Sequence, residues 1–172
     1  MKPRTLFERR FSCRSFDTTP PDRGTLEAVL EAARWAPSGG NLQPWRFVVV
    51  LDSDRRRALA GAAYGQAFLA QAPTVITVCA VPEESVKHYG QRGRDLYCLQ
   101  DTAAAAENVL LAATELGLGS CWVGAFDESA VSRVLELPQN WRPVALIVLG
   151  RPAEAEPRRT RRPLSEVTLW ME

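Results

Sequence analysis

Five stretches of the chain place apolar residues at helical spacing. The clearest covers residues 25–36, where Leu26, Val29 and Ala33 fall on one face, because side chains three and four positions apart share a side of a helix. Polar residues occupy most of the positions between them. Helices are predicted over residues 4–10, 25–36, 52–71, 95–116 and 127–136.

Short runs rich in β-branched and aromatic residues predict buried strands. The first such run reads WRFVVVL and the second TVITVCAV. Strands are predicted over residues 45–51, 74–81, 119–124 and 143–150. Helices and strands follow one another without regular alternation, so the 172 residues are predicted to form a single α+β domain.

Residues 101–116, DTAAAAENVLLAATEL, are apolar around most of the circumference of the helix predicted there. A helix of this kind must be covered on nearly all sides, and its alanines allow a partner helix to come close. In a chain of this length, we expect the cover to come from a second subunit.

Composition narrows the functional classes. A net charge of +1 gives no overall field to attract nucleic acid or an anionic membrane. No apolar run is long enough to span a bilayer and the N-terminus lacks the apolar centre of a signal peptide, so a cytoplasmic location is expected. Cys13, Cys79, Cys98 and Cys121 are scattered and His88 is the only histidine. Neither a metal site nor a histidine-activated nucleophile is predicted.

The N-terminal stretch RRFSCRSF, residues 9–16, is a candidate anion site. Arg10, Ser12 and Arg14 alternate, so an extended backbone would point all three side chains the same way. Two guanidinium groups beside a hydroxyl suit a phosphate, which accepts bidentate charged hydrogen bonds. The same spacing also fits a solvated helix end with surface ion pairs.

The loop WAPSGGNLQPW, residues 35–45, contains donors and acceptors but no nucleophile. Ser38, Gly39 and Gly40 can bring backbone amides near a ligand, while Asn41 and Gln43 add side-chain amides. Such a set can recognise the edge of a planar heterocycle. A tight turn with local side-chain caps is the alternative interpretation.

Residues 151–172 are predicted to form an arm. They are Pro-rich and charged to about residue 163 and then apolar at Val167, Leu169 and Trp170. The run RRTRRP, residues 158–163, is typical of a solvated tail or one that contacts nucleic acid. Phosphate binding is the second interpretation of this run.

Five stretches together carry a family resemblance. They are RRFSCRSF, APSGGNLQPWRFVVV, AYGQAFLAQAPTVITVCA, GLGSCWVGAFDE and RRTRRPLSEV. In these motifs and their order, nearly the whole chain resembles the nitroreductase family of FMN-dependent homodimeric flavoenzymes. The resemblance implies a nitroreductase-like three-layer α-β-α sandwich with a central mixed sheet and an intertwined homodimer. It also implies one FMN-binding domain over residues 1–172, with residues 151–172 docking on the partner subunit.

The resemblance implies three groups of cofactor contacts. The FMN phosphate would be held by Arg10, Ser12, Arg159 and Arg161, with Arg14 nearer the pyrimidine ring. The other subunit would supply Pro37, Ser38, Gly39, Asn41 and Gln43. The flavin ring would lie along Gln66, Trp122, Val123, Gly124 and Ala125, with the Gly124 amide facing N5.

The implied reaction transfers electrons from NADH or NADPH to a nitroaromatic, quinone or activated-alkene acceptor by a ping-pong mechanism. The flavin carries the chemistry, so no catalytic side chain is required. Arg14 and the Gly124 amide would tune the flavin, Arg14 by stabilising the negative charge of its reduced form. The alternatives are a specialised flavoenzyme, such as a dehalogenase, a heterocycle-forming dehydrogenase or a flavin-fragmenting enzyme, and a non-catalytic FMN-binding protein. Neither nucleic acid nor membrane is expected as a partner.

Two departures from the family pattern concern the substrate face. The interval over residues 82–97 is shorter than in many family members, so part of the usual lid is expected to be missing. His88, Tyr89 and Tyr97 lie in this interval and either line the site or remain surface residues. Gly124 stands where some members have a charged residue, which leaves the choice of substrate open.

Overall fold

The computed structural model describes residues 4–157 and 159–172. Its central sheet consists of β1 (Trp45–Val50), β2 (Thr74–Ala80), β3 (Gly119–Val123) and β4 (Arg142–Gly150). The strands pair in the order β1-β2-β4-β3, and every ladder is antiparallel. The one parallel pairing among the described residues is the isolated bridge between Ser12 and Ser120, so the expected mixed character of the sheet is confined to that bridge.

The two central strands explain the continuous apolar runs in the sequence. Every residue of β2 is buried, and in β4 only Arg142 is exposed. A strand that is covered on both faces needs apolar residues at consecutive positions, because both sets of side chains enter a core. TVITVCA and PVALIVLG meet this requirement.

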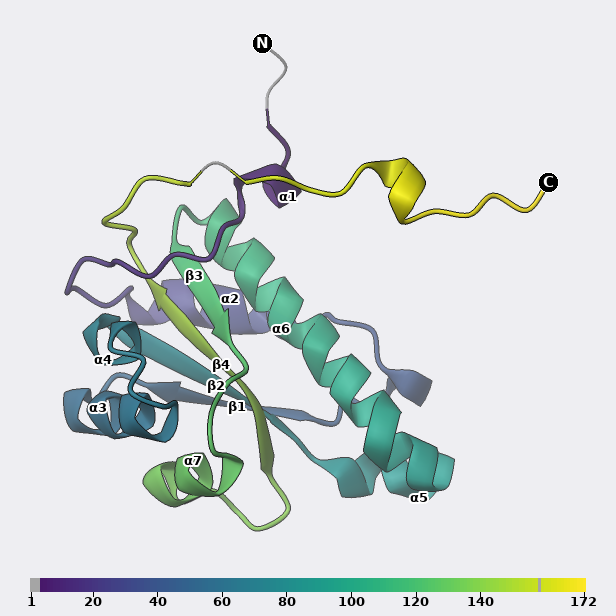
Figure 1. Cartoon of the computed structure of the whole chain (residues 1–172). Helices are drawn as coiled ribbons and strands as arrows, with labels where there is room; N and C mark the ends of the chain where they lie inside the picture. The colour runs from purple at the N-terminus through teal and green to yellow at the C-terminus, as the bar shows by residue number, and fades with distance from the viewer. Residues whose placement is uncertain (1–3, 158) are drawn as a thin grey trace.

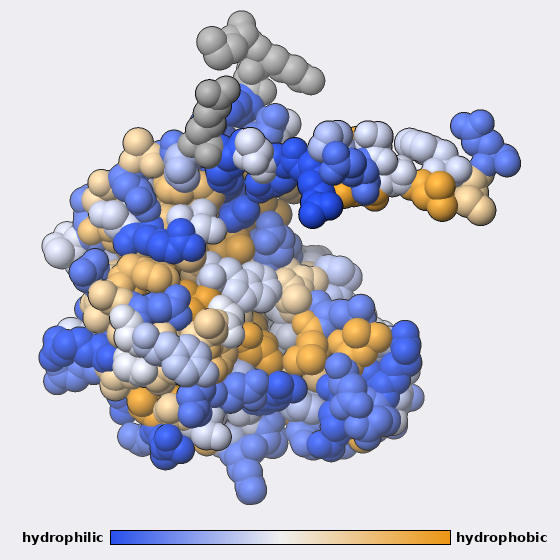
Figure 2. All heavy atoms as spheres, in the orientation of Figure 1, coloured by the Kyte–Doolittle hydropathy of each residue, from blue (hydrophilic) through white to orange (hydrophobic). Residues whose placement is uncertain are grey.

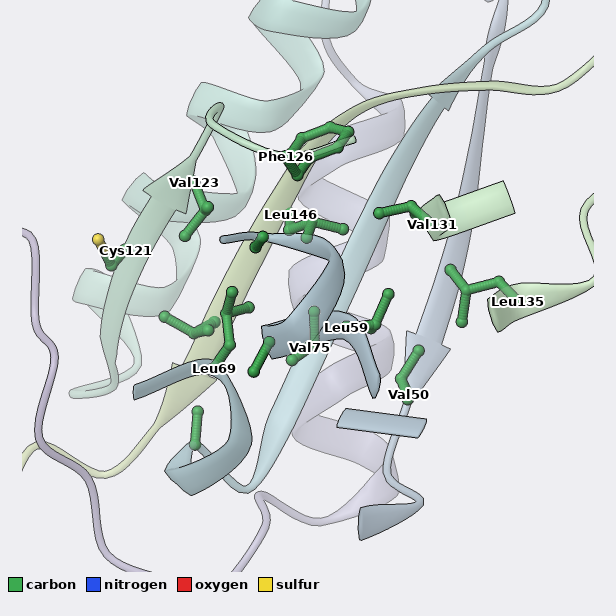
Figure 3. Packing of buried hydrophobic residues seen from close by; sticks show 14 residues of the cluster. Val50, Leu59, Leu69, Val75, Cys121, Val123, Phe126, Val131, Leu135 and Leu146 are labelled. Atoms are coloured by element: carbon green, nitrogen blue, oxygen red, sulfur yellow. The ribbon is translucent and has the colours of Figure 1, made fainter. Parts of the chain in front are cut away.

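Helices cover both faces of the sheet (Figure 1). One layer contains α2 (Arg23–Arg34) and α6 (Cys98–Glu115), whose apolar side chains pack with Ile76 and Ile147 of the sheet. The opposite layer contains α3 (Ser53–Ala62), α4 (Phe68–Gln71) and α7 (Glu128–Leu135). Figure 3 shows the core beneath this layer, with Leu59, Leu69 and Val131 gathered over Val75 and Leu146. The α+β class and the three-layer sandwich are therefore confirmed.

The helix predicted over residues 52–71 is in fact two helices. The chain turns between α3 and α4 at Tyr64 and Gly65, where φ is 57° and 76°. A right-handed helix cannot continue through left-handed residues. The break moves α4 and the residues before it onto the same side of the molecule as the end of β3, which matters for the site below.

A further helix was not predicted. α5 (Pro82–Arg92) begins with proline in its first turn, where the missing amide hydrogen costs no hydrogen bond. Its regular geometry fails at Gly90, and the π-helical turn η2 (Gly93–Tyr97) then leads directly into α6. The interval expected to be short therefore contains its own helix.

The surroundings of α6 agree in part with the expected all-round cover. α2 and the sheet bury one side of it, including Ala106, Val109 and Ala113. Ala103 and Ala112 are only half-buried in the single chain, so cover by a second subunit stays a prediction. No helix within the described ranges is long and apolar enough to cross a bilayer.

The helix nearest the N-terminus and the first part of the C-terminal arm lie at the same end of the molecule (Figure 1). The short helix α1 (Leu6–Arg9) is closed by a capping box between Thr5 and Glu8. The C-terminal arm, residues 151–172, crosses α1 and then extends away from the body (Figure 1). Its outer part contains the turn η3 (Leu164–Glu166), and Leu169 and Trp170 are 82% and 76% exposed. Figure 2 shows apolar side chains along the projecting arm. Docking of the arm on a partner stays a prediction.

Candidate functional site

The segment that follows α1 lies along the edge of the sheet. Ser12 bridges to Ser120 of β3, and the Cys13 amide donates to the Ser120 carbonyl over 2.9 Å. The segment is extended, so its side chains alternate between core and surface. Cys13 is fully buried, and its neighbours Ser12 and Arg14 are exposed. This arrangement puts Ser12 and Arg14 on one surface, as the alternation predicted.

The guanidinium groups of Arg10 and Arg14 give this edge a positive charge. Arg14 lies 5.7 Å from the centre of the Phe68 ring, and its Nη1 is 3.5 Å from the Ser12 carbonyl oxygen. Their effect reaches the neighbouring Cys121. Burial raises the pKa of its thiol, whereas the Arg14 charge, the Ser12 side-chain hydrogen bond and the Arg10 charge act to lower that pKa. The structure therefore brings Arg10, Ser12 and Arg14 together beside β3.

The arm brings Arg159 to the same region. Its guanidinium donates to the carbonyl oxygens of Glu8 and Arg10, at the end of α1, and to the Glu156 carboxylate. Arg161 is exposed and donates to its neighbour's carbonyl. Both arginines line a hollow of about 710 Å³ that also exposes carboxylates of Glu8 and Glu156. Arg4 also lines the hollow, and Glu156 pairs there with Arg4 and Arg159, so these guanidinium groups are already engaged within the chain. Arg158, the first arginine of the predicted run, lies outside the described residues.

A third segment joins the edge through Gln66. Its side-chain nitrogen donates to the carbonyls of Ala63 and Ala125, at 2.9 and 3.0 Å. The turn before α4 is thus tied to the turn after β3. Because that nitrogen is engaged, the free group that Gln66 offers a ligand is its side-chain oxygen.

The predicted ring-contact residues lie at the end of β3. Trp122 is 37% exposed, whereas the side chain of Val123 is buried in the core and leaves only its backbone for a ligand. Gly124 and Ala125 are exposed in the turn that follows. A Cβ added at Gly124 would meet nothing closer than the Trp122 indole nitrogen, at 3.7 Å, so this turn offers open backbone.

The glycine loop before β1 has a defined hydrogen-bonded conformation. Gly39–Asn41 form a 3₁₀ turn, and the Gln43 amide donates to the Ser38 hydroxyl over 3.0 Å. The Gly39 amide is also engaged, with the Asp101 carboxylate at 3.1 Å. The expectation of a bare amide is therefore wrong for Gly39, because its amide donates within the chain. The exposed groups are instead side-chain amides: Gln43 donates to Asn41, at 3.3 and 3.4 Å, which leaves the nitrogen of Asn41 and the oxygen of Gln43 for a ligand.

Backbone strain is concentrated in these segments. Asn41, Gln43 and Tyr64 have positive φ values of 54°, 53° and 57°, and the fourth non-glycine case among the described residues, Glu136, closes α7. Left-handed backbone is costly for residues with a Cβ and persists where the surroundings enforce it, often at ligand sites. Two of the four cases lie in the glycine loop and a third two residues before Gln66.

The loop and the arginine edge lie apart within one chain. Arg10 approaches Glu107 of α6, with Nε 3.9 Å from the carboxylate, while Gly39 contacts Asp101 of the same helix. Six residues of helix separate these contacts by about 9 Å along the axis and about 120° around it. In Figure 1, α1 lies at the upper end of α6 and the segment joining α2 to β1 lies beside its lower half. In one chain these two candidate ligand surfaces, the arginine edge and the glycine loop, are therefore separate.

Comparison with known proteins identifies the architecture. Residues 7–68 and 51–151 match the sequence model described as the nitroreductase family. The chain belongs to the nitroreductase family. It is 34% identical to a Thermus thermophilus protein named NADH dehydrogenase, over 97% of this chain and 95% of that protein. It is 32% identical to the 5,6-dimethylbenzimidazole synthase of Rhodospirillum rubrum, over 88% of this chain and 82% of the relative.

A solved member of the nitroreductase family supports the fold assignment. The crystal structure of a nitroreductase family protein from Streptococcus pneumoniae superposes with a TM-score of 0.89 at 26% identity, and the match covers 96% of this chain and 98% of that one. The family resemblance inferred from five sequence motifs is thereby confirmed.

Two carboxylates of this nitroreductase family member were not predicted as site residues. Glu154 accepts the backbone amides of Arg14 and Ser15 and so fixes the arginine edge. These amides and the Arg14 charge help to lower the pKa of Glu154, so it is ionised at neutral pH. Asp101 holds the glycine loop in the same manner. Each carboxylate lies more than 60 residues from its partner, and no local sequence pattern signals such a contact.

No group of three or more metal-ligating side chains occurs in the described part of the chain. The four cysteines are free and buried. Burial raises the pKa of Cys79 to about 12 and that of Cys13 to about 11. Both thiols therefore remain protonated at neutral pH and are poor nucleophiles.

The glycine loop allows a direct stability test. Gly40 has a φ of 59°, and a Cβ there would lie 2.7 Å from the Tyr89 hydroxyl. Gly40→Ala is therefore expected to lower the free energy of unfolding by about 1–2 kcal/mol, measured by chemical denaturation. Gly61→Ala is the matched control: it lies in α3 with open space around it, and should raise stability by about 0.5–1 kcal/mol. Equal effects of the two changes would contradict the strain assigned to Gly40.

Proposed function

We propose that this protein is an FMN-dependent oxidoreductase that transfers electrons from NADH or NADPH to nitroaromatic, quinone or activated-alkene acceptors. In the proposed enzyme, two chains form a homodimer and share each FMN between them. A cytoplasmic location and the absence of nucleic-acid and membrane partners remain predictions of the same proposal. Membership of the nitroreductase family supports its general form.

The separation of the arginine edge from the glycine loop is the observation that carries the proposal, in which these two surfaces are the half-sites of one cofactor site. The arginine edge has charge for a phosphate but few groups that could recognise a ring edge, whereas the glycine loop has paired amides and no cation. Within one chain they contact different sides of α6. In a twofold dimer each surface can meet its complement on the other subunit. The exposed apolar arm and the half-buried alanines of α6 supply surface for such a contact.

The residues present fit FMN at three points. Arg10, Ser12 and Arg14 form a positive edge beside β3, and the buried Ser120 hydroxyl next to Ser12 has no partner among the described residues. Arg159 and Arg161 adjoin this edge, although Arg159 is already bonded to α1. Open backbone at Gly124 and Ala125 gives room for a planar ring. Pro37, Ser38, Gly39, Asn41 and Gln43 would come from the partner chain.

When bound, FMN would supply the two-electron chemistry between nicotinamide and acceptor. In this proposal the arginines bind and orient the cofactor, and the Arg14 charge favours the form that carries negative charge. The Gly124 amide would donate a hydrogen bond to the bound ring, and Asn41 and Gln43 would hold it in place. No side-chain acid is assigned, which agrees with the proposed ping-pong scheme.

A more specialised reaction is the second candidate. The Rhodospirillum rubrum relative is named as a 5,6-dimethylbenzimidazole synthase, so close relatives perform different chemistry. This alternative predicts a narrow substrate range and slow oxidation of NAD(P)H with general acceptors. A non-catalytic FMN-binding protein would show no oxidation at all.

The proposed function is tested by one purification and two assays. The protein as isolated, or after reconstitution with FMN, is expected to show the two absorption bands of bound flavin. It should then oxidise NADH or NADPH rapidly with both menadione and a nitrofuran, measured at steady state. Bound flavin with no oxidation of NAD(P)H would favour the binding protein, and slow oxidation at a rate that does not depend on the acceptor would favour a specialised enzyme. A colourless protein that cannot be reconstituted would contradict the proposal.

A further inference from the structure

The glycine loop rests on three side chains from the α5–α6 region. A Cβ at Gly39 would lie 3.5 Å from the Tyr89 ring, 3.8 Å from the Tyr97 ring and 3.9 Å from Asp101 Oδ2. Tyr89 and Tyr97 contact each other edge to face at 5.0 Å. Arg92 donates to the Tyr97 hydroxyl over 3.1 Å and fixes that ring. We call Tyr89, Tyr97 and Asp101 the loop platform.

Asp101 is an expensive residue for folding. It is 8% exposed, and its Oδ2 is buried without a hydrogen-bond partner in the described part of the chain. A buried carboxylate with an unsatisfied oxygen disfavours folding, because water solvates it better than the protein does. Asp101 is in the first turn of α6, but η2 continues into that turn, so no free helix terminus needs its charge. What it does provide is the acceptor for the Gly39 amide.

We propose that Asp101 is a positioning residue for the cofactor site of the partner subunit: by holding Gly39 against Tyr89 and Tyr97, it sets where Asn41 and Gln43 meet the flavin. This inference rests on the proposed function. The position of Gly39 affects both side chains directly, because Gly39 begins the 3₁₀ turn that ends at Asn41, and Gln43 follows two residues later. A shift at Gly39 therefore moves both side-chain amides.

The choice of a carboxylate over an amide gives the inference a distinctive signature. Burial raises the pKa of Asp101, because the folded protein solvates the charged carboxylate less well than water does. Its contribution to stability is therefore present at low pH and is lost as the pH rises through the raised pKa. Asp101→Asn should leave the protein at least as stable as the wild type at neutral pH, and this advantage should close on acidification. If the Asp101 charge instead stabilised the fold, Asp101→Asn would be less stable than the wild type at neutral pH.

The first test measures the contact and its effect separately. Asp101→Ala should abolish protection of the Gly39 amide in hydrogen exchange of the FMN-free protein. It should also weaken FMN binding by about ten- to hundredfold, the range for losing a hydrogen bond to a buried charged acceptor. Asp101→Asn keeps an acceptor oxygen and should stay within about fivefold of the wild type. Asp54→Asn is the matched control, an exposed aspartate that pairs with Arg57 on α3, and should change neither quantity.

The second test locates the effect in the dimer. If Asp101 acts through the loop, Asp101→Ala chains mixed with Arg10→Ala chains should recover FMN sites, since one site of the mixed dimer then has an intact edge and an intact loop. Asp101→Ala mixed with Asn41→Ala should recover none, because both defects lie in the same half-site. If Asp101→Ala caused only a general folding defect, mixing it with Arg10→Ala or with Asn41→Ala would give the same recovery of FMN sites.

The outcomes separate this inference from the proposed function. Unchanged FMN affinity after loss of Gly39 protection would overturn the positioning role, and retained protection in Asp101→Ala would overturn the contact itself. If Asp101→Ala does not fold, the rank order of FMN affinity among wild type, Asp101→Asn and Asp101→Ser serves instead, and equal affinities would overturn the role. A wild type that binds no FMN would refute the proposed function, while Gly39 exchange would still test the hold of Asp101 on the loop.

Discussion

Mixing Arg10→Ala chains with Asn41→Ala chains is expected to restore the FMN affinity and the rate of NAD(P)H oxidation that each variant alone has lost. Arg10 belongs to the edge half-site and Asn41 to the loop half-site, and one chain holds them on different sides of α6. In a mixed dimer, the intact edge of one subunit faces the intact loop of the other. Random exchange of equal amounts should make about half of the dimers mixed, and one of the two equivalent sites in each mixed dimer is intact, so about a quarter of all sites should be restored.

The experiment needs only the two variants and a controlled exchange of subunits. Each variant alone should bind FMN at least about tenfold more weakly, since each loses a charged or paired hydrogen bond to the cofactor. Equal amounts are mixed, exchanged under mild denaturant, and titrated with FMN. Mixing two edge variants, Arg10→Ala with Arg14→Ala, is the negative control and should restore nothing. Recovery near zero in the edge-plus-loop mixture would mean that each site is complete within one chain or does not exist.

The strands of the sheet were predictable from short runs of sequence. The four strands begin and end within one residue of their predicted limits, because β-branched and aromatic runs such as WRFVVV have few other uses in a buried core. The helices were less predictable. Nothing in residues 52–71 except Gly65 indicated that Tyr64 would turn left-handed and divide the segment. α5 was missed because glycines at 90 and 93 and its mixed polar composition hide its apolar face.

The candidate site shows the same difference between features that depend on neighbouring residues and features that depend on residues far apart in the sequence. The alternation of Arg10, Ser12 and Arg14 predicted their common surface, because strand geometry depends only on neighbouring residues. The bonds from Gly39 to Asp101 and from Arg14 to Glu154 join residues 62 and 140 positions apart. Only the folded chain reveals such pairs. The family resemblance supplied the grouping of distant motifs but not these two carboxylates.

Replacing Arg14 is expected to lower the midpoint potential of bound FMN and to slow its reduction by NAD(P)H. Arg14 is exposed beside Phe68, at the end of the edge assigned to the flavin pyrimidine. A fixed positive charge there stabilises the negative charge that reduction brings. Water screens an exposed charge, so its removal should cost about 1–2 kcal/mol, which is roughly 20–45 mV for a two-electron couple.

Glu154 gives this prediction a counterpart of opposite sign. Its carboxylate accepts the Arg14 and Ser15 amides, and the lowered pKa keeps it negative at neutral pH. Glu154→Gln removes that charge, leaves Arg14 unopposed and should raise the potential, whereas Arg14→Ala lowers it. Arg23→Ala is the control, because Arg23 pairs with Glu27 on the exposed surface of α2, and should leave the potential unchanged.

Potentials are best measured by equilibrium with reference dyes, on FMN-saturated protein, so that a change in affinity is not mistaken for a change in potential. Shifts of opposite sign at Arg14 and Glu154 would place the reactive ring within reach of both charges. Equal shifts in one direction would indicate a disturbed segment instead, since Glu154 also fixes the backbone there. No shift in either variant would contradict the placement of Arg14 beside the flavin. It would also contradict the proposal that its charge stabilises the reduced form.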